Sequence, residues 1–389
     1  MTRLLTCIGD ANSIHTHGGL PYFLLEASQR AGFIDAGLSL RPAEFWGRRI
    51  GWNLLRLLTA GERGGYQYTD DFLDRLVAQA PAEALSAEII SIFPLFPPLP
   101  YWQGPVSFYI DATLRQSISE YAMGGKPAVG PKAFEAAVAR ERQQYSNAAH
   151  VVCRSRWAAR AAVEEYNVDP RKVHVVPGGA NLPDIDARLV KPRARALKPV
   201  RLGFIGKDWK RKNLGFVLDV AEVLDSRGVD VEVVAAGYHP ARGPRHRLLR
   251  PIGFLNKQND IGRFVDVVTG FHFGCLFSLV EAFGISNVEC MRLGVPVLAW
   301  DVGGIRDTVA DGLGHLFSRG VGPEDVADVV QAHVKIPEAY WALRERVMER
   351  RREATWDRTV AKLIAIWSGA YEHSYAALTS SQLSMQTSG

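Results

Sequence analysis

Cysteine is scarce in this chain, and its placement gives no indication of a disulfide framework or a zinc site. The 389 residues contain four cysteines, Cys7, Cys153, Cys275 and Cys290. They lie far apart and form no Cys-x-x-Cys pair, the spacing that structural zinc modules and redox motifs use. The cysteine content therefore indicates a cytoplasmic protein with reduced thiols.

Long hydrophobic runs are also missing. No segment reaches the roughly 20 apolar residues that a membrane-spanning helix needs. The most apolar stretch, residues 89–102, is interrupted by four prolines. The opening residues, MTRLLTCIGDANS, hold too short an apolar stretch for a secretory signal peptide. We therefore expect a cytoplasmic protein, with at most a peripheral contact to the inner face of the cell membrane.

Neither sign of charge dominates the chain as a whole. The 46 basic residues are interleaved with 41 acidic ones, for a net charge of +5. No stripe of basic and aromatic residues follows a recognised nucleic-acid-binding motif, so nucleic acid is not an expected partner. A mild positive excess instead suits an anionic small molecule or an anionic membrane surface.

Short apolar runs alternate with helical patterns along the chain, which predicts parallel sheets with crossover helices. The length predicts two domains, and the pattern loosens after Pro177 and restarts at about residue 199. An amphipathic helix is expected over 213–228, with Gly228 as its terminator. The predicted strands are 3–9, 88–93, 106–110 and 150–153 in the first half, and 200–206, 229–237, 271–280 and 295–301 in the second.

The segment EAFGISNVE, residues 281–289, carries two glutamates directly after an apolar strand pattern. A helix is expected to begin near Ser286, which places amides of the preceding turn where they can bind a phosphate. Glu281 would then lie at the carboxyl end of a strand, where it could accept hydrogen bonds from sugar hydroxyls. For Glu289 a structural alternative stays open, because Ser286 and Glu289 have the spacing of a capping box.

EAFGISNVECMRLGVPVLAWDVGGIRD, beginning at Glu281, closely resembles the E-x7-E region of family 4 glycosyltransferases, which are retaining enzymes of GT-B fold. The resemblance implies an α/β fold with two Rossmann-like, doubly wound domains facing a central cleft. It implies that Glu281 lies at the transferred sugar and that Glu289 holds the ribose of a nucleoside-diphosphate sugar. The backbone of Phe283, Gly284 and Ile285 would contact the sugar or the diphosphate.

A second segment, GFIGKDWKRKN over 203–213, resembles the strand–loop–helix of the same family that carries an Arg-x4-Lys pair for the diphosphate. Lys212 aligns with the family lysine, and Gly206 lies at the start of the loop. Lys207 stands where the family has arginine, and a lysine lacks the bidentate fork of a guanidinium. Arg211 or Lys210 could compensate for that difference.

The first half of the chain offers weaker candidates. Gly18 and Gly19, between the first strand and a helix, resemble the family's glycine pair that approaches the donor phosphate and the acceptor. Asp111, in YIDATLRQS, lies near the place where many members carry a histidine, and is a candidate acceptor contact. Its alternative is to cap the following helix. Backbone contacts to the nucleobase are expected near Gly253 and Leu255.

The resemblance assigns acceptor binding to an N-terminal domain over 1–190, joined by a C-terminal helix at about 355–373 that crosses back to it. Nucleotide-sugar binding falls to 199–354. No metal is expected, because lysines and helix amides would supply the positive charge for the leaving group. Asp184 and Asp186 form a DxD, a metal motif of the other large glycosyltransferase fold, but they lie in the linker rather than after a strand, so we treat the match as chance.

Three alternatives complete the sequence-based interpretation. A nicotinamide dehydrogenase would need Gly-x-Gly-x-x-Gly at a first strand–helix turn, and neither domain start has it. A catalytically degenerate module that binds a nucleotide sugar or a glycan stays open because Lys207 departs from the family. Residues 45–58, FWGRRIGWNLLRLL, have an amphipathic pattern that could rest on an anionic membrane beside a lipid-linked saccharide acceptor; packing in the core of the N-terminal domain is the favoured expectation.

Overall fold

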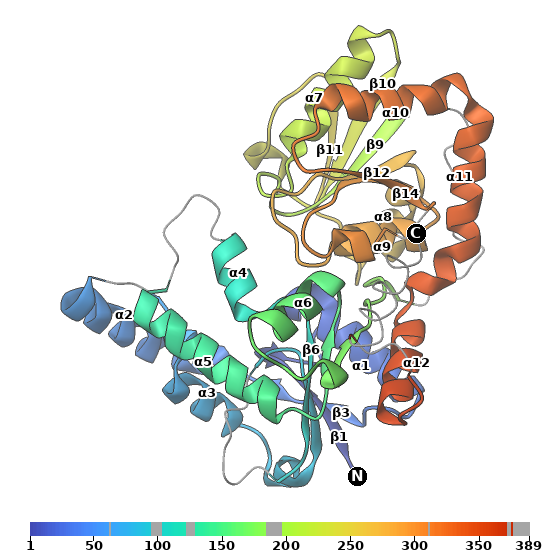
Figure 1. The fold of residues 1–389 in the computed structure, drawn as a ribbon. Coiled ribbons are helices and arrows are strands. Elements are labelled where there is room, and N and C mark those ends of the chain that lie inside the picture. Colours follow the sequence, from blue (N-terminus) through green and yellow to red (C-terminus); the bar gives the residue numbers. More distant parts are fainter. Residues whose placement is uncertain are drawn as a thin grey trace, which may run out of the picture. The chain divides into compact units, whose positions relative to one another are not determined.

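The structure is a computed structural model that describes residues 1–61, 64–94, 103–121, 129–183, 197–309, 312–371 and 375. It divides into two compact units (Figure 1). Unit 1 comprises Met1–Pro177 and Thr359–Gly389, and unit 2 comprises Gly178–Arg358. Each unit is built around its own parallel six-stranded sheet, as the alternating pattern of the sequence predicts.

The sheet of unit 1 has the strand order β3-β1-β5-β6-β7-β8. Its strands are short and mostly buried, because helices cover a parallel sheet of this kind. A small antiparallel pair, β2 with β4, lies beside it. The strands of unit 1 are β1 (Arg3–Thr6), β2 (Gly9–Asp10), β3 (Ala36–Gly37), β4 (Ser39–Leu40), β5 (Glu88–Ser91), β6 (Val106–Ile110), β7 (Val151–Cys153) and β8 (Val173–Val175). The helices that the chain forms between them are α1 (Leu20–Arg30), α2 (Trp46–Ala60), α3 (Asp70–Val77), α4 (Leu114–Tyr121), α5 (Pro131–Asn147) and α6 (Arg156–Glu164).

The sheet of unit 2 has the order β11-β10-β9-β12-β13-β14, and all of its strands are parallel. Its strands are β9 (Val200–Ile205), β10 (Val231–Ala236), β11 (Leu249–Gly253), β12 (Phe273–Leu276), β13 (Val297–Trp300) and β14 (Gly314–Phe317). Its helices are α7 (Leu214–Ser226), α8 (Ile261–Thr269), α9 (Ile285–Arg292), α10 (Pro323–Lys335) and α11 (Pro337–Arg350). This is the strand order of a doubly wound nucleotide-binding fold.

Short 3-10 turns occur at several connections, including η1 (Thr16–Gly19), η2 (Pro42–Phe45), η3 (Tyr66–Tyr68), η4 (Ala82–Ser86), η5 (Pro170–Lys172), η6 (Pro240–Arg242), η7 (Ile305–Asp307) and η8 (Arg351–Ala354). The helix predicted over 213–228 is confirmed as α7, and Gly228 follows it with φ of 79°. A glycine adopts this left-handed backbone at little cost, which is why it ends the helix. The strand predicted over 271–280 is shorter than expected, because only Phe273–Leu276 pair with neighbouring strands.

The C-terminal helix α12 (Trp356–Trp367) returns to unit 1, as predicted. The Trp367 ring packs edge-on against Phe33, with centroids 5.3 Å apart. The indole N–H of Trp367 donates a hydrogen bond to the Glu88 carboxylate at the start of β5. The C-terminal helix therefore packs against residues from the first hundred positions of the chain. The predicted crossing of a C-terminal helix in a GT-B fold is confirmed.

Candidate active site

Two loops of unit 2 leave its sheet where the strand order changes direction. The chain runs outward from β9 to β10 and β11 on one side, and from β12 to β13 and β14 on the other. Since β9 and β12 are parallel neighbours, the loops 206–213 and 277–284 emerge at the same edge of the sheet. Open α/β sheets bind their ligands at such a switch point, outside the carboxyl ends of the strands.

Glu281 and Lys212 lie close together at this edge, and both are largely buried. Lys212 Nζ is 3.8 Å from Glu281 Oε2, and the two side chains are 10% and 11% exposed. Ser278 Oγ donates to the same carboxylate oxygen at 3.2 Å, and Arg211 Nη1 lies 3.3 Å from it. Among the described residues these contacts all use Oε2, so Oε1 is the oxygen that can accept a hydrogen bond from a bound hydroxyl.

The conformation of the β9 loop depends on Gly206. A Cβ atom at Gly206 would lie 2.4 Å from Lys212 Cδ, so only glycine lets the lysine side chain pass. The two loops are also fastened to each other, because Arg211 Nη1 donates to the Val280 carbonyl at 2.8 Å. Arg211 therefore contacts the loop that carries Glu281. This contact fits a role in positioning the Glu281 carboxylate better than a role as the phosphate-binding arginine of the family.

Helix α9 begins one residue earlier than expected. Gly284 is its N-cap in a left-handed conformation, with φ of 83° and no side-chain cap. The alternative that Ser286 and Glu289 form a capping box is therefore wrong. Gly284 is the N-cap, so Glu289 lies in the second turn of the helix rather than at its third residue. Ser286 Oγ instead lies 3.3 Å from Lys212 Nζ. The Phe283 side chain is buried, so only the backbone of the turn can face a ligand.

Glu289 is the more deeply buried acid, with its side chain 2% exposed. Its Oε1 forms an ion pair with Lys257 Nζ. Lys257 Nζ also donates to the Asn181 carbonyl at 3.4 Å and lies 4.7 Å from the centre of the Phe264 ring. A carboxylate this buried needs a cation or several donors to offset its lost hydration, and Lys257 supplies that charge.

Lys207 does not join the Glu281 contacts. Its side chain is exposed, and its ammonium lies 5.0 Å from the centre of the Phe254 ring, which is 59% exposed. Gly253 is the last residue of β11 and has φ of 86°. Leu255 is buried in a hydrophobic cluster with Phe264 and Phe283, so its side chain serves packing and leaves its backbone as the group that could contact a ligand.

In unit 1, the predicted glycine pair forms the entrance to α1. Gly18 and Gly19 have φ of 69° and 91°, and Gly19 is the N-cap of the helix. A Cβ at Gly19 would lie 3.2 Å from the Ile14 carbonyl oxygen. His17 Nε2 makes a hydrogen bond with the Ile8 carbonyl at 3.0 Å, so this histidine helps to shape the loop.

Asp111 directly follows β6 and pairs with Arg154. Its Oδ1 lies 2.7 Å from Arg154 Nη1, and the side chains are 43% and 3% exposed. The alternative that Asp111 caps the following helix is wrong, because Thr113 and Gln116 exchange hydrogen bonds there. Gln116 N donates to Thr113 Oγ1 at 3.3 Å, and Thr113 N donates to Gln116 Oε1 at 3.0 Å. This reciprocal cap frees Asp111 for a contact at the strand end.

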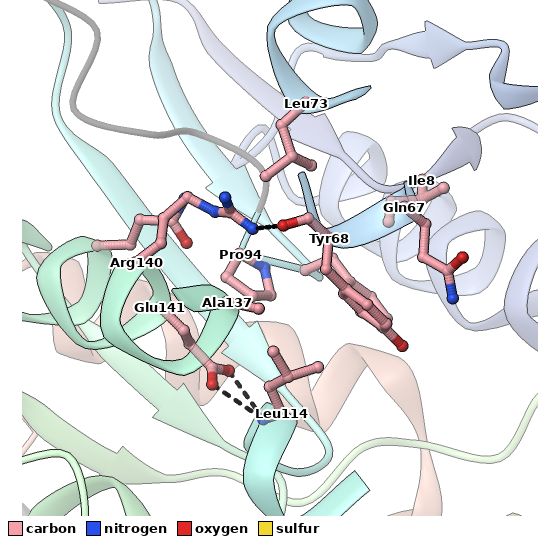
Figure 2. Close-up of a pocket in the computed structure, with 11 residues that line it drawn as sticks. Ile8, Gln67, Tyr68, Leu73, Pro94, Leu114, Ala137, Arg140 and Glu141 are labelled. Carbon is pink, nitrogen blue, oxygen red and sulfur yellow. Dashed lines mark hydrogen bonds between the residues drawn. The ribbon is translucent and has the colours of Figure 1, made fainter. Parts of the chain in front are cut away.

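Figure 2 shows a cavity in unit 1, lined in part by Glu141 and Leu114. Its volume of about 20 Å³ is room for about one water molecule, not for a sugar ring. The Glu141 carboxylate accepts from Leu114 N at 3.0 Å and from Tyr145 Oη at 2.7 Å. Burial raises the pKa of Glu141 to about 7. The cavity thus lies beside a buried carboxyl group of the core and is too small to be an acceptor site.

Metal ligands do not gather in the described residues, where no group of three or more His, Cys, Asp or Glu side chains could hold an ion. Asp184 and Asp186 of the DxD lie outside the described ranges. Sequence reasoning missed Lys257, although it follows the Gly253–Leu255 segment by two residues. The sequence alone gives no sign that Lys257 contacts Glu289, because the two residues are 32 positions apart in the chain.

Comparison with known proteins agrees with this geometry. The family model described as glycosyl transferases group 1 matches residues 199–336, which include the Lys212, Lys257, Glu281 and Glu289 region. A D-inositol 3-phosphate glycosyltransferase of Thermomonospora curvata is 27% identical over 267 residues, 59% of each chain. One of Geodermatophilus obscurus is 28% identical over 308 residues, 71% of this chain and 64% of the relative. The chain thus matches less than two thirds of the length of these curated relatives.

A solved structure of Anabaena HepE, in complex with UDP and glucose, matches with a TM-score of 0.63 and 13% identity. The match covers 95% of this chain and all of the HepE chain. At this identity the likeness shows the fold, which is GT-B. The two parallel sheets and the crossing C-terminal helix agree with this fold, and residues 199–336 are similar to the group 1 glycosyltransferases.

Proposed function

We propose that the protein is a retaining glycosyltransferase that moves a sugar from a nucleoside-diphosphate sugar to a hydroxyl of a glycan or lipid-linked saccharide. The observation that carries this proposal is the buried Glu281–Lys212 pair at the switch point of the unit 2 sheet, beside the start of α9. A hydrogen-bond acceptor for hydroxyls and a cation for phosphates lie within 4 Å of each other there. Unit 2 would bind the donor and unit 1 the acceptor, on the cytoplasmic side of the membrane.

Lys212 and the start of α9 would bind the diphosphate. The first amides of a helix have no intrahelical partner, and the helix dipole favours an anion beside them. Ser286 Oγ, 3.3 Å from Lys212 Nζ, adds a further donor. Lys207 would contribute charge from the outer side of the same loop. These groups stabilise the charge that develops on the diphosphate as the sugar departs, so the proposal needs no metal ion.

Glu281 would orient the transferred sugar. Ser278 and Arg211 hold its Oε2, which fixes the direction in which Oε1 accepts hydrogen bonds. The carboxylate also stabilises positive charge that develops on the sugar. The acceptor oxygen attacks the anomeric carbon from the leaving-group face as the bond from that carbon to the phosphate oxygen breaks. Because attack and departure use the same face of the sugar, the configuration is retained, and the departing diphosphate takes the acceptor proton.

Glu289 would hold the ribose hydroxyls through the oxygen that does not face Lys257. The backbone at Gly253 and Leu255 would contact the base, and that at Phe283, Gly284 and Ile285 the sugar or diphosphate. Gly18, Gly19 and Asp111 would contribute to acceptor binding in unit 1. The solved complex of HepE with UDP and glucose supports UDP as the first nucleotide to test.

One observation favours a second candidate, a module that binds a nucleotide sugar without turnover. Lys207 replaces the family arginine and lies over Phe254 rather than beside Glu281. A weakened diphosphate site could bind the donor and fail to stabilise the departing charge. The two candidates differ in turnover, because only the enzyme releases the nucleoside diphosphate from the bound donor.

The test is release of the nucleoside diphosphate from UDP-, GDP- and ADP-sugars in the presence of EDTA. The wild-type protein should hydrolyse one donor class slowly, since water can replace an acceptor. Glu281→Gln should lower the rate about 100-fold, as removal of one preorganised group at a reacting centre does. Glu338→Gln, an exposed glutamate in α11, is the matched control. Binding without release supports the module, and neither binding nor release overturns both candidates.

A further inference from the structure

Helix α2 presents an apolar face that the described residues leave exposed. Six large apolar side chains on this one helix have exposures between 38% and 76%. The favoured expectation that this segment packs in the core is therefore wrong for these side chains. Figure 1 shows α2 at the outer edge of unit 1. The six residues, called the α2 face below, are Trp46, Ile50, Leu54, Leu55, Leu57 and Leu58.

The opposite side of α2 is fastened to unit 1. Trp52 Nε1 donates to the Gly64 carbonyl at 3.3 Å, and Asn53 Oδ1 accepts from Gly64 N at 3.1 Å. The Trp52 ring also packs against Tyr66, with centroids 6.2 Å apart. At about 100° of rotation per residue, Trp52 lies on the side of the helix opposite the α2 face, and Asn53 lies at the edge of that face, next to Trp46. These contacts therefore turn the α2 face outward.

The charges of α2 indicate what covers this face. Its charged residues are Arg48, Arg49 and Arg56, and residues 46–60 contain no acid. Arg48 and Arg49 flank the α2 face on its two sides, and Arg48 stays 56% exposed although it lies 4.0 Å from Asp71. Arginine can lay its stem along an apolar surface while its guanidinium reaches anionic groups.

A second copy of the chain suits this face poorly. Packing α2 against α2 would bring arginines of both copies together, and like charges across an interface are costly. An anionic lipid surface satisfies both features at once, because its acyl region takes the apolar side chains and its phosphates pair with the arginines. A tryptophan at the edge of the face suits the membrane–water boundary.

We propose that α2 docks unit 1 on an anionic lipid membrane, with the helix axis in the plane of the interface and the α2 face in the headgroup–acyl boundary. Among the described residues no helix is long and apolar enough to cross a membrane. The docking does not require the transfer reaction. If the proposed function holds, docking brings the enzyme to a lipid-linked acceptor.

The experiment is co-sedimentation of the full chain with vesicles of phosphatidylcholine, alone or mixed with phosphatidylglycerol. Wild-type protein should bind the mixed vesicles, and its binding should weaken as salt rises. Ile50→Glu/Leu54→Glu should lower the partition coefficient by at least about tenfold. Ile336→Glu/Ile364→Glu, two exposed isoleucines outside α2, should leave it unchanged. Arg48→Gln/Arg49→Gln should lower it about fivefold for each arginine at low salt.

The proposal is overturned if wild-type protein ignores anionic vesicles, or if Ile50→Glu/Leu54→Glu binds them as wild type does. Sedimentation velocity of the same proteins tests whether a second copy of the chain covers the α2 face instead. A wild-type dimer that Ile50→Glu/Leu54→Glu dissociates, with no vesicle binding, would make the α2 face an interface between copies. Melting temperatures of all variants should match wild type, because the substituted side chains are exposed. No donor sugar is present, so failure here is distinct from failure of the transferase proposal.

Discussion

The Glu289–Lys257 ion pair should affect both the free energy of unfolding and the affinity for a nucleoside diphosphate. Lys257→Met removes the cation and leaves Glu289 buried, with its side chain 2% exposed, whereas Lys257 itself is 23% exposed. Breaking a buried ion pair by removing one partner costs about 3–5 kcal/mol. Since water can reach the Lys257 side, we expect about 2–3 kcal/mol for Lys257→Met. Glu289→Gln should cost about 1 kcal/mol, because the unpaired lysine can turn to solvent.

Binding should respond in the opposite order. Glu289→Gln removes the charged acceptor for the ribose, and a hydrogen bond to a charged group contributes about 1.5–3 kcal/mol. The Kd of the preferred nucleoside diphosphate should therefore rise about 10- to 100-fold. Lys257→Met keeps the Glu289 carboxylate, so its Kd should change far less.

The assays are denaturant unfolding and titration calorimetry of both single variants and the double variant. The stability cycle should give a coupling free energy of at least about 1 kcal/mol. A coupling near zero would refute the ion pair. Unchanged nucleotide affinity in Glu289→Gln would refute its ribose role, whatever the stability data show.

Three further predictions follow from single contacts. Gly206→Ala places a Cβ 2.4 Å from Lys212 Cδ, so it should displace the lysine side chain. Calorimetry should then show that nucleoside-diphosphate binding weakens about tenfold. Gly215→Ala in α7, whose Cβ would meet no atom closer than 3.9 Å, is the control. Lys212→Met should lower the rate of diphosphate release more than Lys207→Met does, because Lys212 lies beside Glu281, and equal effects in a release assay would contradict that assignment. Burial raises the pKa of Glu141 from 4.5 to about 7, so the folded state binds this proton more strongly than the unfolded state. The proton's contribution to the free energy of unfolding is therefore full below pH 4.5 and is lost as pH rises through 7. That loss is on the order of 3 kcal/mol; Glu141→Gln should abolish it, which unfolding curves between about pH 5 and 8 can check.

The sequence allowed prediction of the GT-B fold, which is confirmed, and of a resemblance to glycosyltransferases, which the family match over residues 199–336 bears out. Buried parallel strands are short apolar runs, so their pattern is visible without tertiary contacts. The end of α7 could be predicted because Gly228 has a local conformational role. The strands β8 and β14 were not predicted as separate elements. The strand β11 contains Pro251, and proline obscures a strand pattern.

The candidate site was harder to predict where its contacts join distant residues. Glu281 and Lys212 could be proposed from their motifs, but the contacts of Arg211 and Ser278 with one carboxylate oxygen depend on how two loops fold together. The start of α9 was misplaced because Ser286 and Glu289 matched a capping box, while the backbone of Gly284 decided the boundary. Exposure of the α2 face was not predictable, because an amphipathic pattern does not show which side is covered.

Metal-independent binding of a nucleoside diphosphate beside Lys212 is tested most directly by calorimetric titration of the wild-type protein with UDP, GDP, ADP and CMP in EDTA. We expect that one nucleoside diphosphate binds without metal, and that the Lys212→Met variant binds it at least about tenfold more weakly. If no nucleotide binds, or if binding appears only when magnesium is added and is unchanged in Lys212→Met, the proposed donor site is wrong.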